Sequence, residues 1–141
     1  MVDRALLASR VAAIRDAVAR IRAVLPPKAD AFIGDRTARE VVILNLFVAL
    51  QESLSLATHW LADEGWAVPQ SYREIFMCLA DHAVVERELA ARLAAASGLR
   101  NLVAHRYGVV DWGRIHAIAS SELDDLLAFC SALARKADAT D

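Results

Sequence analysis

The spacing of apolar residues constrains this fold more than any other feature, because it repeats with the period of an α-helix. Between residues 7 and 25, apolar side chains recur at alternating steps of four and three: Leu7, Val11, Ile14, Val18, Ile21 and Leu25. Such steps place side chains along one face of a helix. No useful length of the chain alternates apolar and polar residues as a half-buried strand does. The pattern therefore predicts an all-α fold.

Residues that cap or break helices mark the limits of the first three helices. Pro26-Pro27 ends the first helix, and Gly34-Asp35 precedes a second helix that we expect to reach about Asp63. Within it, residues 41–50 are apolar nearly all round, so this helix should be central. Ser71-Tyr-Arg-Glu74 matches the capping box that opens a helix, and this third helix is short.

The second half of the chain predicts two further long helices. After a short break, a fourth helix runs over residues 86–104. Gly108 and Gly113 bracket a turn, and Asp111 in that turn is the expected N-cap of the last helix, which frays from Lys136. The apolar residues of that last helix keep the same four-three rhythm: Ala119, Leu123, Leu126, Cys130 and Leu133.

These elements predict a single all-α up-and-down bundle of four long helices plus one short helix, with residues 1–141 as one domain. The chain has 141 residues, of which only 5 are glycine and 3 are proline. So few turn-forming residues argue against a β-sandwich and against disorder. The longest uncharged run, residues 41–51, falls short of the roughly 20 residues that a membrane-spanning helix needs.

Charge and cysteine content narrow the partners and the compartment. The formal net charge of −2 argues against a generic nucleic-acid binder. Residues 1–30 and 86–116 are net positive, at +3 and +2, and they either converge in space or are scattered. Cys78 and Cys130 lie in apolar surroundings without C-x-x-C or zinc-ligand spacing. We interpret them as buried thiols of a protein in the reducing cytoplasm.

Three of the four histidines have an ordinary structural interpretation. No two histidines are four residues apart, and neither H-E-x-x-H nor E-x-x-H occurs, which argues against a zinc or di-iron bundle. The chain also lacks a glycine-rich phosphate loop and a G-x-S-x-G elbow. We therefore expect His59, His82 and His116 to be structural or partly exposed residues, and no cofactor is predicted.

The segment 98–108 is different, because it concentrates chemically active side chains at the end of a predicted helix. Within eight residues it contains Arg100, Asn101, His105, Arg106 and Tyr107. Arginine binds phosphate through a two-pronged fork, and histidine exchanges a proton near neutral pH. Such a pair is able to cleave RNA without a metal. The histidine would act on the 2′-hydroxyl or the leaving 5′-oxygen, and the arginine would bind the charge at phosphorus.

The spacing of this pair raises a geometric question. Five residues of a regular helix turn by roughly 500°, so Arg100 and His105 would lie about 140° apart around the axis. Three explanations stay open: the helix is distorted near Gly98, the long arginine reaches round, or a second subunit completes the site. A two-fold dimer would bring together two histidines and two arginines. A further alternative is a polar helix end whose basic residues suit the helix dipole.

The pattern R-x4-H-x-Y, formed by Arg100, His105 and Tyr107 with Asn101 after the arginine, is similar to that of the HEPN ribonucleases. More closely, the chain resembles the HepT toxins of the HepT/MntA toxin–antitoxin systems. Further features support the likeness: the entry Gly98-Leu-Arg-Asn101, the segment Tyr72-Arg-Glu-Ile-Phe76, and Asp111 before a long final helix. The resemblance covers essentially the whole chain and implies a HEPN-like helical domain.

The resemblance also implies an activity, partners and a means of regulation. It implies a metal-independent endoribonuclease toxin that cuts cellular RNA at a composite site in a homodimer interface. Arg100 and His105 would be the catalytic pair and Asn101 a supporting residue. The implied partner is an MntA-like nucleotidyltransferase antitoxin that transfers AMP from ATP to Tyr107. The added phosphate would bring charge and bulk to the place where RNA phosphate must bind.

Two other functions remain open from the sequence. One is a non-catalytic helical protein that binds and orients a nucleotidyltransferase, since some HEPN relatives lack nuclease activity. The other is a bundle that binds a small ligand in a closed apolar pocket away from residues 100–107.

Overall fold

A computed structural model of the chain describes residues 2–105 and 110–139. Its first helix, α1 (Arg4–Val24), begins where the Asp3 carboxylate accepts hydrogen bonds from the backbone N–H groups of Ala5 and Leu6. It ends at Leu25, which is extended as the residue before a proline must be. The residues of the predicted apolar stripe within α1 are buried, which confirms the periodicity.

A short helix that the sequence analysis did not predict separates the first two long helices. α2 (Ala29–Ile33) has five residues and buries Phe32 completely. α3 (Arg36–Asp63) then begins after Asp35, whose carboxylate accepts a hydrogen bond from the Ala38 N–H at 3.1 Å. The predicted limits of this second long helix are therefore confirmed.

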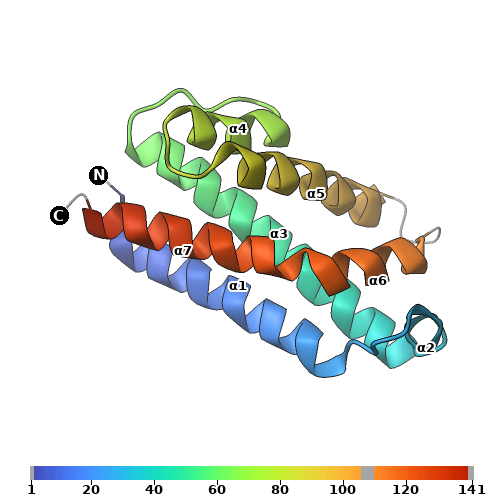
Figure 1. Cartoon of the computed structure of the whole chain (residues 1–141). Helices are drawn as coiled ribbons and strands as arrows, with labels where there is room; N and C mark the ends of the chain where they lie inside the picture. The colour runs from blue at the N-terminus through green and yellow to red at the C-terminus, as the bar shows by residue number, and fades with distance from the viewer. Residues whose placement is uncertain (1, 106–109, 140–141) are drawn as a thin grey trace.

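α3 is the central helix of the described fold, as its apolar sequence predicted. It packs against each of the other six described helices, and Figure 1 shows it crossing between the α4–α5 pair and the α1–α7 pair. By length and apolarity it is also the one described helix of a kind that can cross a membrane. An 18-residue stretch of it has a mean hydropathy of 1.6, and half of that stretch is buried inside the fold.

α4 (Tyr72–Asp81) and α5 (Arg87–His105) form a hairpin against α3. The predicted cap is confirmed, because the Ser71 hydroxyl accepts a hydrogen bond from the Glu74 N–H at 3.1 Å. The turn between the helices passes through Ala83, whose φ of 58° is in the left-handed region that favours glycine.

The single long helix predicted at the end of the chain is in fact two helices. α6 (Trp112–Ser121) and α7 (Leu123–Ala139) are separated at Glu122, where the chain bends. The apolar residues keep their four-three spacing across this break because both helices bury the same face. However, α6 packs on α2 and α3, whereas α7 packs on α1, α3 and α5, so the chain must change direction.

Two smaller predictions about this region are also wrong. Gly113 lies within α6 rather than in the turn before it, because the Asp111 cap starts the helix one residue earlier. α7 continues through Lys136 to Ala139, because buried Ala137 holds its last turn against the core. Over the residues that the structure describes, the bundle therefore has the four predicted long helices, α1, α3, α5 and α7, but three short ones where one was predicted.

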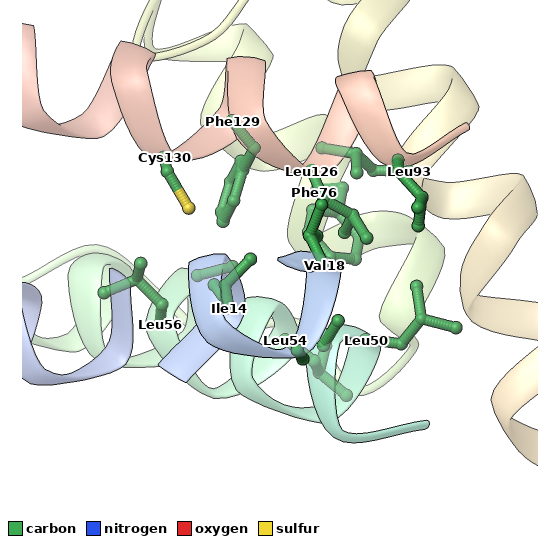
Figure 2. Close-up of a cluster of buried hydrophobic side chains, with 14 of the residues drawn as sticks. Ile14, Val18, Leu50, Leu54, Leu56, Phe76, Leu93, Leu126, Phe129 and Cys130 are labelled. Carbon is green, nitrogen blue, oxygen red and sulfur yellow. The ribbon is translucent and has the colours of Figure 1, made fainter. Parts of the chain in front are cut away.

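All four long helices contribute to one continuous apolar core (Figure 2). Phe129 of α7 is fully buried and contacts Phe76 of α4 edge to face, with ring centroids 5.8 Å apart. The two described ends of the chain lie side by side (Figure 1), where the Arg4 guanidinium donates a hydrogen bond to the Ala137 carbonyl at 2.7 Å.

Candidate functional site

The predicted catalytic residues lie at the C-terminal end of α5. The backbone at Arg100, Asn101 and His105 is helical, and His105 is the last residue of the helix. Tyr107, the predicted site of modification, lies outside the described residues. The structure therefore places three of the four predicted site residues on one helix end.

The helix is not interrupted between Arg100 and His105. Gly98 is helical, and a Cβ at that position would meet no atom within 4 Å, so no close approach requires a glycine there. The expected disturbance at Gly98 is therefore wrong. A continuous helix keeps positions 100 and 105 about 140° apart around its axis. This leaves a reaching arginine or a second subunit as the ways to unite the pair.

Buried residues on both sides fix the position of the motif. Leu99, at 4% exposure, anchors α5 in the core directly before Arg100, and Leu93, at 2% exposure, anchors it nearer the start of the helix. On the far side, half-buried Val110 packs against the core and Asp111 caps α6, accepting a hydrogen bond from the Arg114 N–H at 3.1 Å. The motif is thus attached to the core before and after residues 106–109.

An aromatic cluster with one arginine lies where α6 begins. Phe32 of α2 meets Trp112 edge to face at 6.1 Å between centroids, and it contacts the ring of His116 at 5.5 Å. The Arg39 guanidinium, from the second turn of α3, lies over the Trp112 ring, 5.1 Å from its centroid. The Arg39 Nε atom is buried and has no hydrogen-bond partner among residues 2–105 and 110–139. The sequence analysis did not single out Arg39 or Trp112.

The remaining histidines occupy the structural or exposed positions that were predicted. His116 is buried, and its Nε2 lies 2.8 Å from the Pro26 carbonyl oxygen. His82 stacks on Trp66 with centroids 3.7 Å apart, and its Nδ1 lies 3.0 Å from the Cys78 carbonyl oxygen. His59 is exposed on α3.

The two cysteines differ in burial. Cys130 is fully buried, and desolvation raises the pKa of its thiol to about 11. Cys78 is only half-buried, so the prediction of a buried thiol is confirmed for Cys130 alone. Within residues 2–105 and 110–139, no three His, Cys, Asp or Glu side chains are grouped so that they would hold a metal ion.

The helical bundle, with this motif at the end of its fifth helix, defines a protein of the HEPN class. A model of the family described as Ribonuclease HepT-like matches residues 14–133. The chain therefore belongs to the HepT-like ribonuclease family.

Curated relatives and solved structures agree with this assignment. The mRNA nuclease HepT of Shewanella oneidensis is 27% identical over 124 residues, which make up 88% of this chain and 92% of that protein. The structure of the tri-AMPylated Shewanella oneidensis HEPN toxin in complex with MNT antitoxin superposes with a TM-score of 0.85. It is 26% identical, and the match covers 96% of this chain and 99% of the toxin.

Two further structures extend the comparison. A toxin–antitoxin structure with AMP-PNP gives a TM-score of 0.85 at 25% identity, covering 92% of this chain and 98% of the other. YutE, a cytosolic protein of unknown function from Bacillus subtilis, gives a TM-score of 0.86 at 14% identity, which shows the fold alone.

Proposed function

We propose that this chain is a metal-independent endoribonuclease toxin of a type VII-like toxin–antitoxin system, acting on cellular RNA in the cytoplasm. One observation carries the proposal: α5 ends on the Arg100–His105 motif, inside a bundle that matches a HEPN toxin over nearly its whole length. Residues 1–141 would act as a single HEPN-like domain. The protein needs no cofactor of its own, since arginine and histidine supply the charge and the proton transfer.

The division of roles follows from the chemistry of the two side chains. His105 would remove the proton from the ribose 2′-hydroxyl, which then attacks the adjacent phosphorus, or protonate the 5′-oxygen that leaves. Arg100 would bind the negative charge that accumulates on the phosphate oxygens in the transition state. Asn101 would support the pair from the next position on the helix. We expect a pH optimum near the ordinary histidine pKa of about 6.5 and no effect of chelators.

A homodimer would complete the site. One cleavage needs a base and an acid, whereas each chain offers one histidine in the motif. The angle of about 140° between positions 100 and 105 also separates the pair on a single helix. A two-fold axis near the end of α5 would bring two copies of the motif together.

Control by an antitoxin completes the proposal. The related toxin named above is AMPylated and bound to an MNT antitoxin. We propose that a similar MntA-like nucleotidyltransferase transfers AMP from ATP to Tyr107 of this chain. Because Tyr107 is two residues beyond His105, the added phosphate would compete with RNA phosphate for the same cations.

His105→Ala tests the nuclease, with His59→Ala as the matched control. Both changes remove a histidine, but His59 is exposed on α3 and belongs to no proposed site. With protein free of antitoxin and shown by intact mass to be unmodified, we expect His105→Ala to slow cleavage of a labelled RNA by at least about 100-fold. His59→Ala should cleave at the wild-type rate. Cleavage by His105→Ala at the wild-type rate would rule out the proposed site.

A further inference from the structure

We propose that Arg39 binds a backbone phosphate of the RNA next to the scissile one and so helps to position the substrate. This inference rests on the proposed ribonuclease function and adds a residue from α3 to the site. Its starting point is the state of the Arg39 side chain, which is half-buried over Trp112 with a buried Nε that lacks a hydrogen-bond partner.

Arg39 differs from two arginines of nearby helices that have an ion pair within the described residues. Arg36 binds Glu40 at 2.9 Å, and Arg92 binds Asp125 at 3.0 Å. For Arg39, no carboxylate of the described residues lies within ion-pair distance. Two acids close in sequence to the residues of the cluster serve as helix caps: Asp35 accepts from the Ala38 N–H, and Asp111 from the Arg114 N–H.

An arginine in this state is suited to an anion from outside the protein. A partly buried cation without an anion partner is costly, and a contact with an aromatic face offsets only part of that cost. The guanidinium has five N–H donors, and the ring of Trp112 uses none of them in a conventional hydrogen bond. The phosphates of an RNA backbone are anions whose geometry matches this planar fork.

The packing of three helices places Arg39 at the same end of the bundle as the motif. Leu46 of α3, Leu93 of α5 and Ile118 of α6 line one small apolar cavity. α5 ends at the end of the bundle where α3 and α6 begin (Figure 1). Three residues lie roughly 10 Å from the cavity toward that end, each measured along the axis of its own helix from the cavity residue of that helix. They are Arg39 on α3, Arg100 on α5 and Trp112 on α6. The three helices thus bring Arg39 and the motif to the same end of the molecule.

Trp112 acts as a positioning residue in this arrangement. Its ring lies against Arg39, and the buried Phe32 supports it edge to face. A guanidinium packed over a supported ring is restricted in position before RNA binds. Less conformational entropy is then lost when the phosphate is bound.

The test measures RNA binding by Arg39→Gln, with Arg20→Gln as the control of equal charge. Arg20 is exposed on α1 and forms only a surface pair with Asp16. The probe is a fluorescent single-stranded RNA carrying 2′-O-methyl groups, which lacks the attacking hydroxyl, and the protein is confirmed as unmodified. We expect Arg39→Gln to raise Kd at least about tenfold. The slope of log Kd against log salt should fall by about 0.7, the value for one phosphate contact.

Arg20→Gln should leave both Kd and the salt slope at their wild-type values. An Arg39→Gln protein with the wild-type Kd and slope overturns the inference. If wild-type protein cleaves RNA while Arg39→Gln binds normally, only the role of Arg39 fails. If wild-type protein neither binds nor cleaves RNA, the proposed function itself fails.

A measurement on the wild-type protein covers the case in which Arg39→Gln does not fold. In a ¹⁵N spectrum of the arginine side chains, the Nε–H resonance of Arg39 should shift when the same RNA is added to saturation. The Nε–H resonance of Arg20 should stay in place. An Arg39 resonance that does not move at saturation contradicts the proposed contact.

Discussion

His116 and Arg39 both contact the aromatic cluster at the start of α6, but within the described part of the chain only His116 has a hydrogen-bond partner. Its Nε2 lies 2.8 Å from the Pro26 carbonyl oxygen, which ties α6 to the end of the first helix. A buried polar group that is satisfied in this way stabilises the fold. The Arg39 Nε is buried and has no such partner among the described residues. In the same cluster, His116 therefore has a structural role, whereas Arg39 has the proposed role in binding RNA.

Burial of the Cys130 thiol makes stability depend on pH in the alkaline range. Its pKa is raised from 9.0 to about 11, because the core disfavours the thiolate. Between these values the unfolded chain loses the thiol proton and the folded chain keeps it. The free energy of unfolding should therefore fall as pH rises from 9 to 11, by an amount on the order of 2 kcal/mol, and this contribution is fully present below pH 9.

Denaturant unfolding of wild type and Cys130→Ala between pH 8 and 11 checks this prediction. Other groups titrate in the same range, so the relevant quantity is the difference between the two proteins. The variant starts less stable because it lacks the buried sulfur, but its stability should fall less steeply with pH. Equal slopes in the two proteins would contradict the assigned role of Cys130.

Among the elements, the turn between α4 and α5 contains a strained residue that serves no proposed function. Ala83 has a φ of 58° and is exposed. A left-handed conformation costs a residue with a side chain roughly 1–2 kcal/mol, whereas glycine adopts it freely. Ala83→Gly should therefore raise the free energy of unfolding by about 0.5–1 kcal/mol, after allowing for the greater freedom of glycine in the unfolded chain.

Ala80→Gly is the matched control, because it makes the same chemical change within helical α4. We expect it to lower stability by about 1 kcal/mol. Urea unfolding of both variants measures whether each substitution raises or lowers the free energy of unfolding. A destabilised Ala83→Gly protein would show that glycine does not relieve strain in this turn.

The elements also show which parts of the fold the sequence was able to predict. Asp35, Ser71 and Asp111 cap their helices through contacts only three residues away, so the sequence predicted those starts. The break at Glu122 depends instead on which distant helices α6 and α7 pack against, and the apolar rhythm continues unchanged through it. α2 is too short for its period to be recognised.

The candidate site divides in the same way. Arg100, Asn101 and His105 were predicted because they lie within one short motif, whose spacing the continuous helix preserves. Arg39 was missed because its role depends on Trp112, which is distant in sequence and reaches it only through the packing of α3 against α6. No local pattern carries that information.

For the whole molecule, a composite site makes cleavage depend on association between chains. If two copies of the motif form the site, the specific activity per chain should fall on dilution below the dimer dissociation constant. Arg100 and His105 remain intact throughout, so the loss would report assembly alone. RNA cleavage and sedimentation, measured over the same range of concentrations, check this, and a monomer with full specific activity would exclude the composite site.

The pairing of the two chain ends affects how the protein folds during its own synthesis. Arg4 binds the Ala137 carbonyl across 133 residues, and α7 supplies Phe129, Cys130 and Leu133 to cover the core that α1 begins. Closing so long a loop is costly in entropy and cannot precede the appearance of α7. The motif on α5 leaves the ribosome before α7 does, while the apolar stripe of α1 is still uncovered. A nascent chain therefore cannot form the complete fold before α7 has been made. If the chain is the ribonuclease proposed above, the messenger RNA being translated meets no finished enzyme on its own ribosome until then.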